Sequence, residues 1–222
     1  MAPMFKGIPA DAFDFFEELT ADNTKVWWTA NKDRYQESVK GPVEELLGEL
    51  APEFGPAKIF RPYRDTRFSK DKTPYKTNVG ATTRAKDGSI YYLALQPEGM
   101  YIGAGYYRMA KDQIARFRVA VDDAKTGRAL ESLVADAVKK GNLEVGGEQL
   151  KRVPPGFDKD HPRGELLKHK GLYLGTQHEP AAWMGTKKAK DRVASTWRII
   201  QPTLQWFHTH VGPSDDPEAW GN

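Results

Sequence analysis

Residues 90–104 read IYYLALQPEGMYIGA and carry the clearest β-sheet signal in the chain. Aromatic and aliphatic side chains dominate on both sides of Pro97-Glu98-Gly99, a sequence typical of a tight turn. The stretch therefore predicts two antiparallel strands, over residues 90–96 and 100–104. Upstream, residues 58–61 and 75–83 predict two more strands, and Asp87-Gly88 predicts the turn that leads into residue 90. We expect these four segments to form an antiparallel meander.

Apolar residues at helical spacing flank the strand run on both sides. The N-terminal flank predicts helices over residues 10–20, from an N-cap at Asn23 to Gly41, and from Pro42 through Val43, Leu46, Leu47 and Leu50. The C-terminal flank predicts helices over residues 114–121, 130–138 and 193–207, the last bent or broken at Pro202. Shorter predicted elements are a strand pair at 143–145 and 150–153, a helical turn at 165–169 and a strand at 172–176.

The order helices, strands, helices predicts an α+β fold with a largely antiparallel central sheet. Helices from the N- and C-terminal parts are expected to pack on that sheet. At 222 residues the chain has the length of one large domain, so we predict a single domain over 1–222. Its core is expected at about 10–211, with residues 212–222 as a C-terminal tail.

The composition excludes several classes of protein. With 39% hydrophobic and 28% charged residues, it is that of a folded soluble protein. The chain has no cysteine, which excludes disulfides, thiolate catalysis and cysteine-based metal sites. No apolar run approaches 18 residues, so we predict a cytoplasmic protein without a membrane span.

No cofactor or metal site is predicted. Gly103-x-Gly105 lacks the third glycine of a dinucleotide-binding turn. His208-x-His210 and His178-Glu179 lack the spacing that puts two metal ligands on one helix face.

The net charge of +3 conceals an uneven distribution. Residues 58–118 carry 13 basic and five acidic side chains, a net charge of +8, whereas residues 1–57 have a net charge of −6. Within 58–76 there are seven basic residues and two acidic ones, interleaved with Tyr63, Phe68 and Tyr75. A solvated face of paired charges would not need so many aromatic residues, so this segment is the main candidate for a binding site.

Arginines can grip a phosphate or carboxylate with two parallel hydrogen bonds, and lysines add mobile point charges. Hydroxyls from Thr66, Ser69 and Thr73 could add donors, while Asp65 and Asp71 are expected to stay ionised and to orient the arginines. The predicted ligand-binding residues are Arg61, Arg64, Arg67, Lys70, Lys72, Tyr75 and Lys76, together with Trp28.

Several functions fit this pattern. The segment could bind a small anionic ligand, or it could bind nucleic-acid phosphates without sequence specificity. It could also belong to a hydrolase or transferase in which Asp65, Asp71 or His161 handles a proton. Finally, the charges could pair internally and serve only the architecture. No helix-turn-helix, zinc-finger or RNP-type motif narrows the choice.

A second charged segment contains Asp158, Asp160 and His161, followed by Glu165 and Lys168. Asp160 could orient His161 as a base, the pair could contact a ligand, or His161-Pro162 could simply begin a helix. Trp27, Trp28 and Trp197 are expected to be core residues or groove walls.

The run RDTRFSKDKTPYK, at 64–76, resembles the signature of a family of bacterial and fungal proteins catalogued as domain of unknown function 2461. Three further stretches resemble it: the aromatic segment with Trp27, Trp28, Asn31 and Tyr35; Gly103-x-Gly105 with Arg116 in the next helix; and residues 150–168. The similarity extends from about Phe13 to Phe207. It implies a shared fold and no established activity.

Overall fold

A computed structural model of the chain describes residues 4–67, 70–83 and 88–216. The first half contains α1 (Asp11–Ala21), α2 (Lys25–Arg34), the π-helix η1 (Tyr35–Lys40), α3 (Gly41–Phe54), β1 (Ala57–Ile59), β2 (Val79–Thr83), β3 (Ile90–Gln96) and β4 (Gly99–Tyr106). The second half contains α4 (Lys111–Asp122), α5 (Ala124–Gly141), β5 (Glu144–Gly146), α6 (Gly164–Leu167), β6 (Leu172–His178), the 3₁₀-helix η2 (Ala182–Gly185) and α7 (Lys188–His210).

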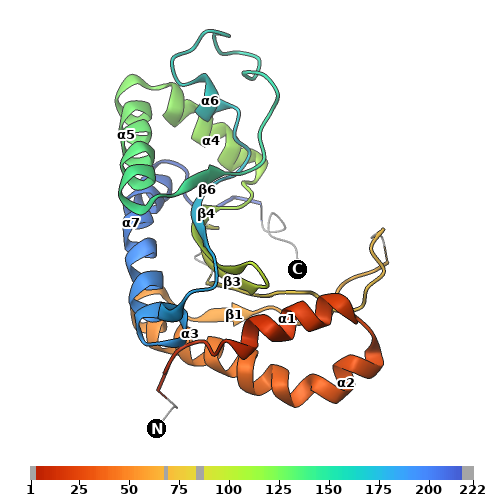
Figure 1. The fold of residues 1–222 in the computed structure, drawn as a ribbon. Helices are drawn as coiled ribbons and strands as arrows, with labels where there is room; N and C mark the ends of the chain where they lie inside the picture. Colours follow the sequence, from red (N-terminus) through yellow and green to blue (C-terminus); the bar gives the residue numbers. More distant parts are fainter. Residues whose placement is uncertain (1–3, 68–69, 84–87, 217–222) are drawn as a thin grey trace. The chain divides into compact units, whose positions relative to one another are not determined.

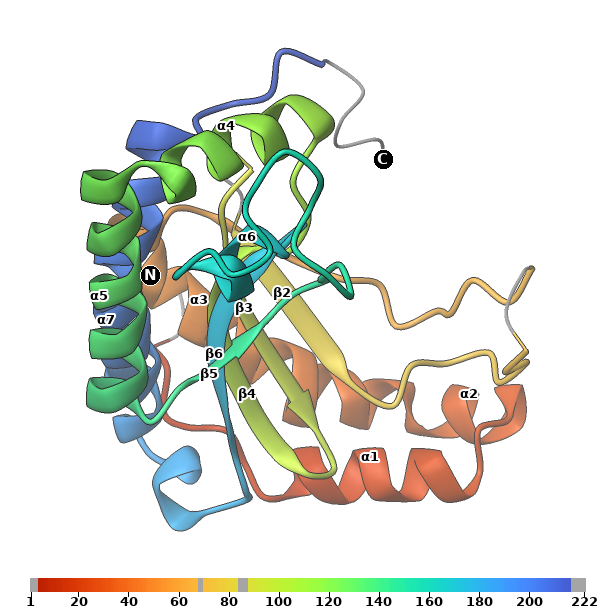
Figure 2. The same ribbon diagram turned by 90° about the horizontal axis from the view of Figure 1, so that it is seen from above.

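The strands form one open six-stranded sheet in the order β1-β2-β3-β4-β6-β5 (Figures 1 and 2). Antiparallel registers include Lys58 opposite Thr82, Ala81 opposite Leu93, and Val145 opposite Leu174. Helix α3 packs against β1, and α5 packs against β5. The predicted α+β fold with an antiparallel central sheet is confirmed.

The chain divides into two compact units. The first comprises Met1–Thr83, Tyr92–Ile102 and Gln177–Ser195, and the second comprises Arg84–Tyr91, Gly103–Thr176 and Thr196–Asn222. The single domain over 1–222 stays a prediction. None of the helices in the described residues combines the length and apolar character needed to cross a membrane. The cytoplasmic location likewise stays a prediction.

The N-terminal helices follow the predicted pattern, with two corrections. Helix α1 buries Phe13, Phe16 and Leu19, as the spacing predicts. The N-cap of α2 is Thr24 and not Asn23, because the Thr24 hydroxyl accepts a hydrogen bond from the Trp27 amide at 3.2 Å. The prediction that Gly41 ends this helix is also wrong. The π-helix η1 carries the chain directly into α3, and Gly41 lies where a Cβ would come within 2.9 Å of the Gln36 carbonyl oxygen.

The predicted hairpin at 90–104 is confirmed as β3 and β4, joined through the turn before Gly99. The strand predicted over 75–83 is shorter than expected, because only Val79–Thr83 joins the sheet as β2. Asp87, part of the predicted turn before β3, lies outside the described residues.

In the second unit the predicted pairing of residues 143–145 with 150–153 is wrong. Strand β5 pairs instead with β6, which comes almost 30 residues later in the chain. Phe117 of α4 stacks on Phe207, with ring centroids 5.4 Å apart, in the core of this unit. The predicted break at Pro202 does not occur, since α7 runs without interruption from Lys188 to His210.

Candidate functional site

The strongest candidate site is built on the connection between β1 and β2, residues 60–78, here called the basic arm. Its two sides pair at the base, where Tyr63 and Tyr75 form an antiparallel bridge. The Arg64 amide donates to the Pro74 carbonyl at 2.9 Å, and the Lys76 amide donates to the Pro62 carbonyl at 2.8 Å. Residues 64–67 and 70–74 extend away from β1 and β2 (Figures 1 and 2).

Asn23 fastens the basic arm to the α1–α2 connection. Its side-chain Nδ2 donates to the Tyr75 carbonyl and its Oδ1 accepts from the Tyr75 amide, both at 3.0 Å. This double hydrogen bond engages both the nitrogen and the oxygen of the side-chain amide and resembles the pairing of a neighbouring strand. The role of Asn23 is therefore to hold Tyr75, and the residue expected to cap a helix instead positions the arm.

Aromatic rings form the base on which the arm rests. The Tyr75 ring stacks on Trp28, with centroids 4.3 Å apart and an interplanar angle of 11°. Both side chains are buried, whereas Tyr63, whose ring lies 5.5 Å from that of Tyr75, is 49% exposed. Burial, and then the neighbouring Tyr63, raises the pKa of Tyr75. Of these three rings only Tyr63 is open to a ligand; Trp28 and Tyr75 hold it in place.

Acidic and basic side chains of the arm pair with each other beyond the Tyr63–Tyr75 bridge. Arg67 donates to Asp65 through Nε at 3.0 Å and Nη2 at 2.8 Å, and Arg64 pairs with Asp71. The Arg67 side chain lowers the pKa of Asp65 to about 2. The pKa of Asp71 is lowered first by the Thr73 amide and hydroxyl and then by Arg64. The two carboxylates orient the arginines, as expected, and their low pKa values make both weak bases at neutral pH.

The remaining cations of the arm, Arg61, Lys70, Lys72 and Lys76, form no ion pair with a carboxylate of the described residues. Lys72 donates to the Thr66 carbonyl at 2.8 Å. Phe68 and the predicted hydroxyl donor Ser69 lie outside the described residues.

Arg61, Arg64 and Lys76 form a group that we call the cation cluster. Burial lowers the pKa of Lys76, and the positive charges of Arg61 and Arg64 lower it further. The Lys76 ammonium also lies over the Phe60 ring, 5.6 Å from its centroid. The Nε atom of Arg64 is buried and has no hydrogen-bond partner among the described residues. Like charges gathered in this way favour an anion between them.

The second predicted segment lies in the second unit, where it closes the end of α4. The His161 Nε2 lies 3.3 Å from Asp122, and its Nδ1 accepts the Arg163 amide at 3.0 Å. Asp122, and not Asp160, therefore orients His161. Because both ring nitrogens are engaged, the imidazole has no free position for a substrate proton.

Arg163, which the sequence did not single out, is the central residue of this segment. It is 8% exposed, and its guanidinium donates to the Val121 carbonyl at 2.7 Å and to the Asp122 carbonyl at 2.9 Å. These are carbonyls of the last turn of α4, which have no partner within the helix. The segment's described contacts are architectural, and nothing in the sequence around Arg163 marks it as the residue that makes them.

The stretch with Gly103-x-Gly105 and Arg116 also resembles the family, and two of its residues, Gly105 and Arg116, have structural roles in the second unit. A Cβ on Gly105 would lie 2.3 Å from the Cα of Tyr173, so β4 and β6 could not approach each other as they do. Arg116 donates to the carbonyls of Val211 and Pro213, at 2.6 and 2.5 Å. It thereby fixes the chain that follows α7.

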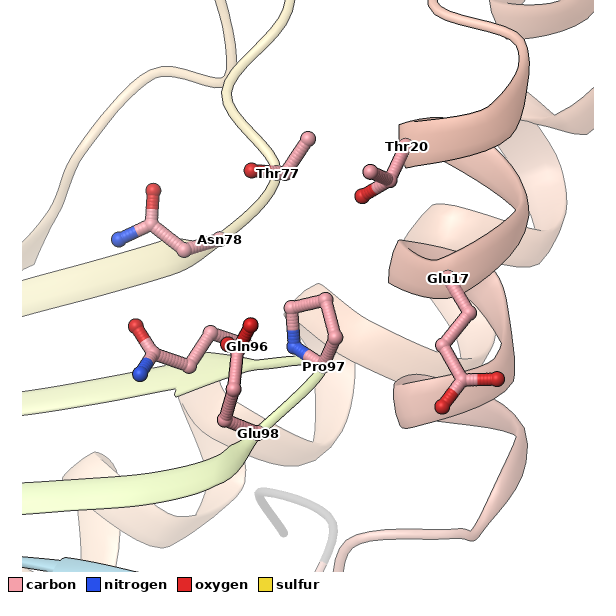
Figure 3. A pocket seen from close by; sticks show the side chains of 7 residues that line it. All are labelled: Glu17, Thr20, Thr77, Asn78, Gln96, Pro97 and Glu98. Atoms are coloured by element: carbon pink, nitrogen blue, oxygen red, sulfur yellow. The ribbon is translucent and has the colours of Figure 1, made fainter.

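Two cavities lie away from the predicted residues. One, of about 550 Å³ in the first unit, is lined by Glu17, Thr20, Thr77, Asn78, Gln96, Pro97 and Glu98 (Figure 3). The other, of about 500 Å³ in the second unit, is lined by Ala115, Arg116, Val119, Ala120, Asp123, Thr126 and His210. Both draw on segments far apart in the sequence, and no local motif predicts either.

A family model described as a conserved hypothetical protein, DUF2461, matches residues 11–206. The chain belongs to the DUF2461 family. The matched part of this DUF2461 protein includes the basic arm, the aromatic base and the segment around Arg163, so the resemblance found in the sequence is confirmed. Comparison with curated proteins and with solved structures gives no match. The family description assigns no activity, and function is therefore argued from the site.

Proposed function

We propose that the basic arm binds an anionic ligand that carries a phosphate or carboxylate group. The observation that carries the proposal is the cation cluster, where burial and then the charges of Arg61 and Arg64 lower the pKa of Lys76. Arg64 already pairs with Asp71, but Arg61 and Lys76 have no carboxylate partner in the described residues, and an anion beside them would offset their repulsion. The free guanidinium of Arg61 supplies paired donors, and the Lys76 ammonium supplies a compact charge.

The ion pairs of the arm support the same function in another way. Asp65 pairs with Arg67 and Asp71 pairs with Arg64, so Arg61 and Lys76 are the members of the cation cluster without a carboxylate partner in the described residues. Tyr63 lies at the base of the arm with about half of its surface exposed. A planar or apolar part of the ligand could rest on this ring while its anionic group meets the cation cluster.

A nucleic-acid strand is the second candidate, and the projecting shape of the arm favours it (Figure 2). The arm carries cations beyond its paired base, with Lys70 exposed. Exposed Tyr63 could stack on an unpaired base. An enzyme reaction is less well supported, because Asp65 and Asp71 are held ionised in ion pairs and His161 has both nitrogens engaged.

Pyrophosphate is the simplest probe of the anion site. By calorimetry at low ionic strength we expect saturable binding to the wild-type protein, weakened about tenfold or more by Arg61→Gln and by Lys76→Gln. The loss reflects removal of one charged hydrogen-bond donor in each variant. A fall of affinity with rising salt is expected as well.

Lys32→Gln serves as the matched control, because Lys32 is an exposed lysine of α2 in the same unit. It should change the affinity less than twofold. Equal losses in all three variants, or no saturable binding by the wild-type protein, would contradict the proposal. Tighter binding of oligothymidylate than of pyrophosphate, with a steep salt dependence, would identify the nucleic-acid strand as the ligand.

A further inference from the structure

The cavity of about 550 Å³ in the first unit lies between α1 and the ends of two strands (Figure 3). Glu17 and Thr20 come from α1, Thr77 and Asn78 precede β2, and Gln96, Pro97 and Glu98 form the end of β3 and its turn. Its volume is within the range of small-molecule sites. None of the residues predicted to bind an anion lines it.

Several polar groups of this cavity can accept hydrogen bonds. The Thr20 hydroxyl donates to the Phe16 carbonyl at 2.7 Å, which leaves its lone pairs as acceptors. The Gln96 amide nitrogen donates one of its two hydrogens to the Gln177 side-chain oxygen at 3.2 Å, and the Gln96 side-chain oxygen can accept. Glu17 and Glu98 add two carboxylates, which only accept when ionised.

The cavity is also electronegative. Neither Glu17 nor Glu98 forms an ion pair with a basic side chain in the part of the chain that the structure describes. The neighbouring Glu18, in contrast, is neutralised by Arg34 at 2.8 Å. Glu17 and Thr20 lie in the C-terminal half of α1, where the helix dipole adds further negative potential.

We propose that this cavity binds an organic amine, specifically an aliphatic diamine or polyamine. A primary ammonium has three donors and no acceptor, which complements the two carboxylates and the acceptor oxygens of Thr20 and Gln96. The Pro97 ring, which lies between the two sides of the cavity in Figure 3, offers an apolar surface for the methylene chain. Two carboxylates are too few for a metal cage, and no group of three potential metal ligands occurs in residues 4–67, 70–83 and 88–216.

Spermidine and putrescine are the probes, added to the full-length protein and followed by calorimetry at low ionic strength. The wild-type protein is expected to bind spermidine saturably. Glu17→Gln and Glu98→Gln should each weaken binding about tenfold or more, because each removes a charged acceptor. Glu37→Gln, an exposed glutamate of η1 in the same unit, is the control and should change the affinity less than twofold.

Thermal unfolding of each variant will verify that it is folded, as expected for exposed Glu17 and Glu98. Absence of saturable binding by the wild-type protein, or equal losses in all three variants, would overturn the proposal. The amine site stands independently of the anion site. Lys76→Gln should abolish neither spermidine binding nor its dependence on Glu17, so either proposal can fail while the other holds.

Discussion

Gly105→Ala is expected to reduce the free energy of unfolding by about 4 kcal/mol or more, or to prevent folding altogether. The added methyl group would lie 2.3 Å from the Cα of Tyr173 and 2.5 Å from the Leu172 carbonyl oxygen. Both obstacles are backbone atoms of β6, which no side-chain rotation can move. The φ angle of Gly105 is +154°, a conformation that alanine rarely adopts, so strain adds to the clash. Urea denaturation followed by circular dichroism would measure the loss.

Gly48→Ala makes the same chemical change at a position with no such obstacle. Gly48 is exposed in α3, and a Cβ there would meet no atom within 4 Å. Alanine is the better helix former, so the variant should be more stable by about 1 kcal/mol. The two substitutions are therefore expected to change the free energy of unfolding in opposite directions. A Gly105→Ala protein as stable as the wild type would show that β4 and β6 lie farther apart than described.

Arg163→Ala should lower the free energy of unfolding by about 3 kcal/mol. The guanidinium donates to two carbonyls at the end of α4 and is almost fully buried, so its removal leaves acceptors without partners and creates a cavity. It also takes a positive charge from the negative end of the helix dipole. Chemical denaturation is again the appropriate measurement.

Arg152→Ala is the control for this substitution, since Arg152 belongs to the same family-like segment but is exposed. It forms no ion pair in the described part of the chain and should cost less than about 0.5 kcal/mol. A loss below about 1 kcal/mol for Arg163→Ala would mean that the segment's basic residues serve something other than the end of α4.

Most helices and strands of this protein can be predicted from its sequence. Residues 90–96 are a strand with the predicted bounds, and the apolar spacing of α1 and α3 predicts their buried faces. Local patterns are less informative where distant partners decide the structure. No sequence pattern near residue 144 shows that β5 pairs with β6. A glycine often ends a helix, but at Gly41 the π-helix η1 continues directly into α3.

The candidate site can likewise be predicted from the sequence only in part. The density of cations and aromatics in the basic arm predicts a special segment, and the expectation that Asp65 and Asp71 orient arginines agrees with the structure. Which cations lack a carboxylate depends on how the arm pairs with itself, and sequence alone does not contain that geometry. The role of Asn23 depends on a partner 52 residues away, and the amine cavity draws on three separate segments.

We propose above that the cation cluster at the base of the arm receives an anion. Burial and two neighbouring arginines disfavour the charged form of Lys76, so its pKa in the free protein should lie below the usual 10.5. A bound anion favours the charged form and should raise that pKa. The most direct test is an NMR titration of the Lys76 side chain, without and with saturating pyrophosphate. We expect a depressed Lys76 pKa that rises when pyrophosphate binds, and a Lys76 pKa that is the same in both titrations would rule out an anion at the cation cluster.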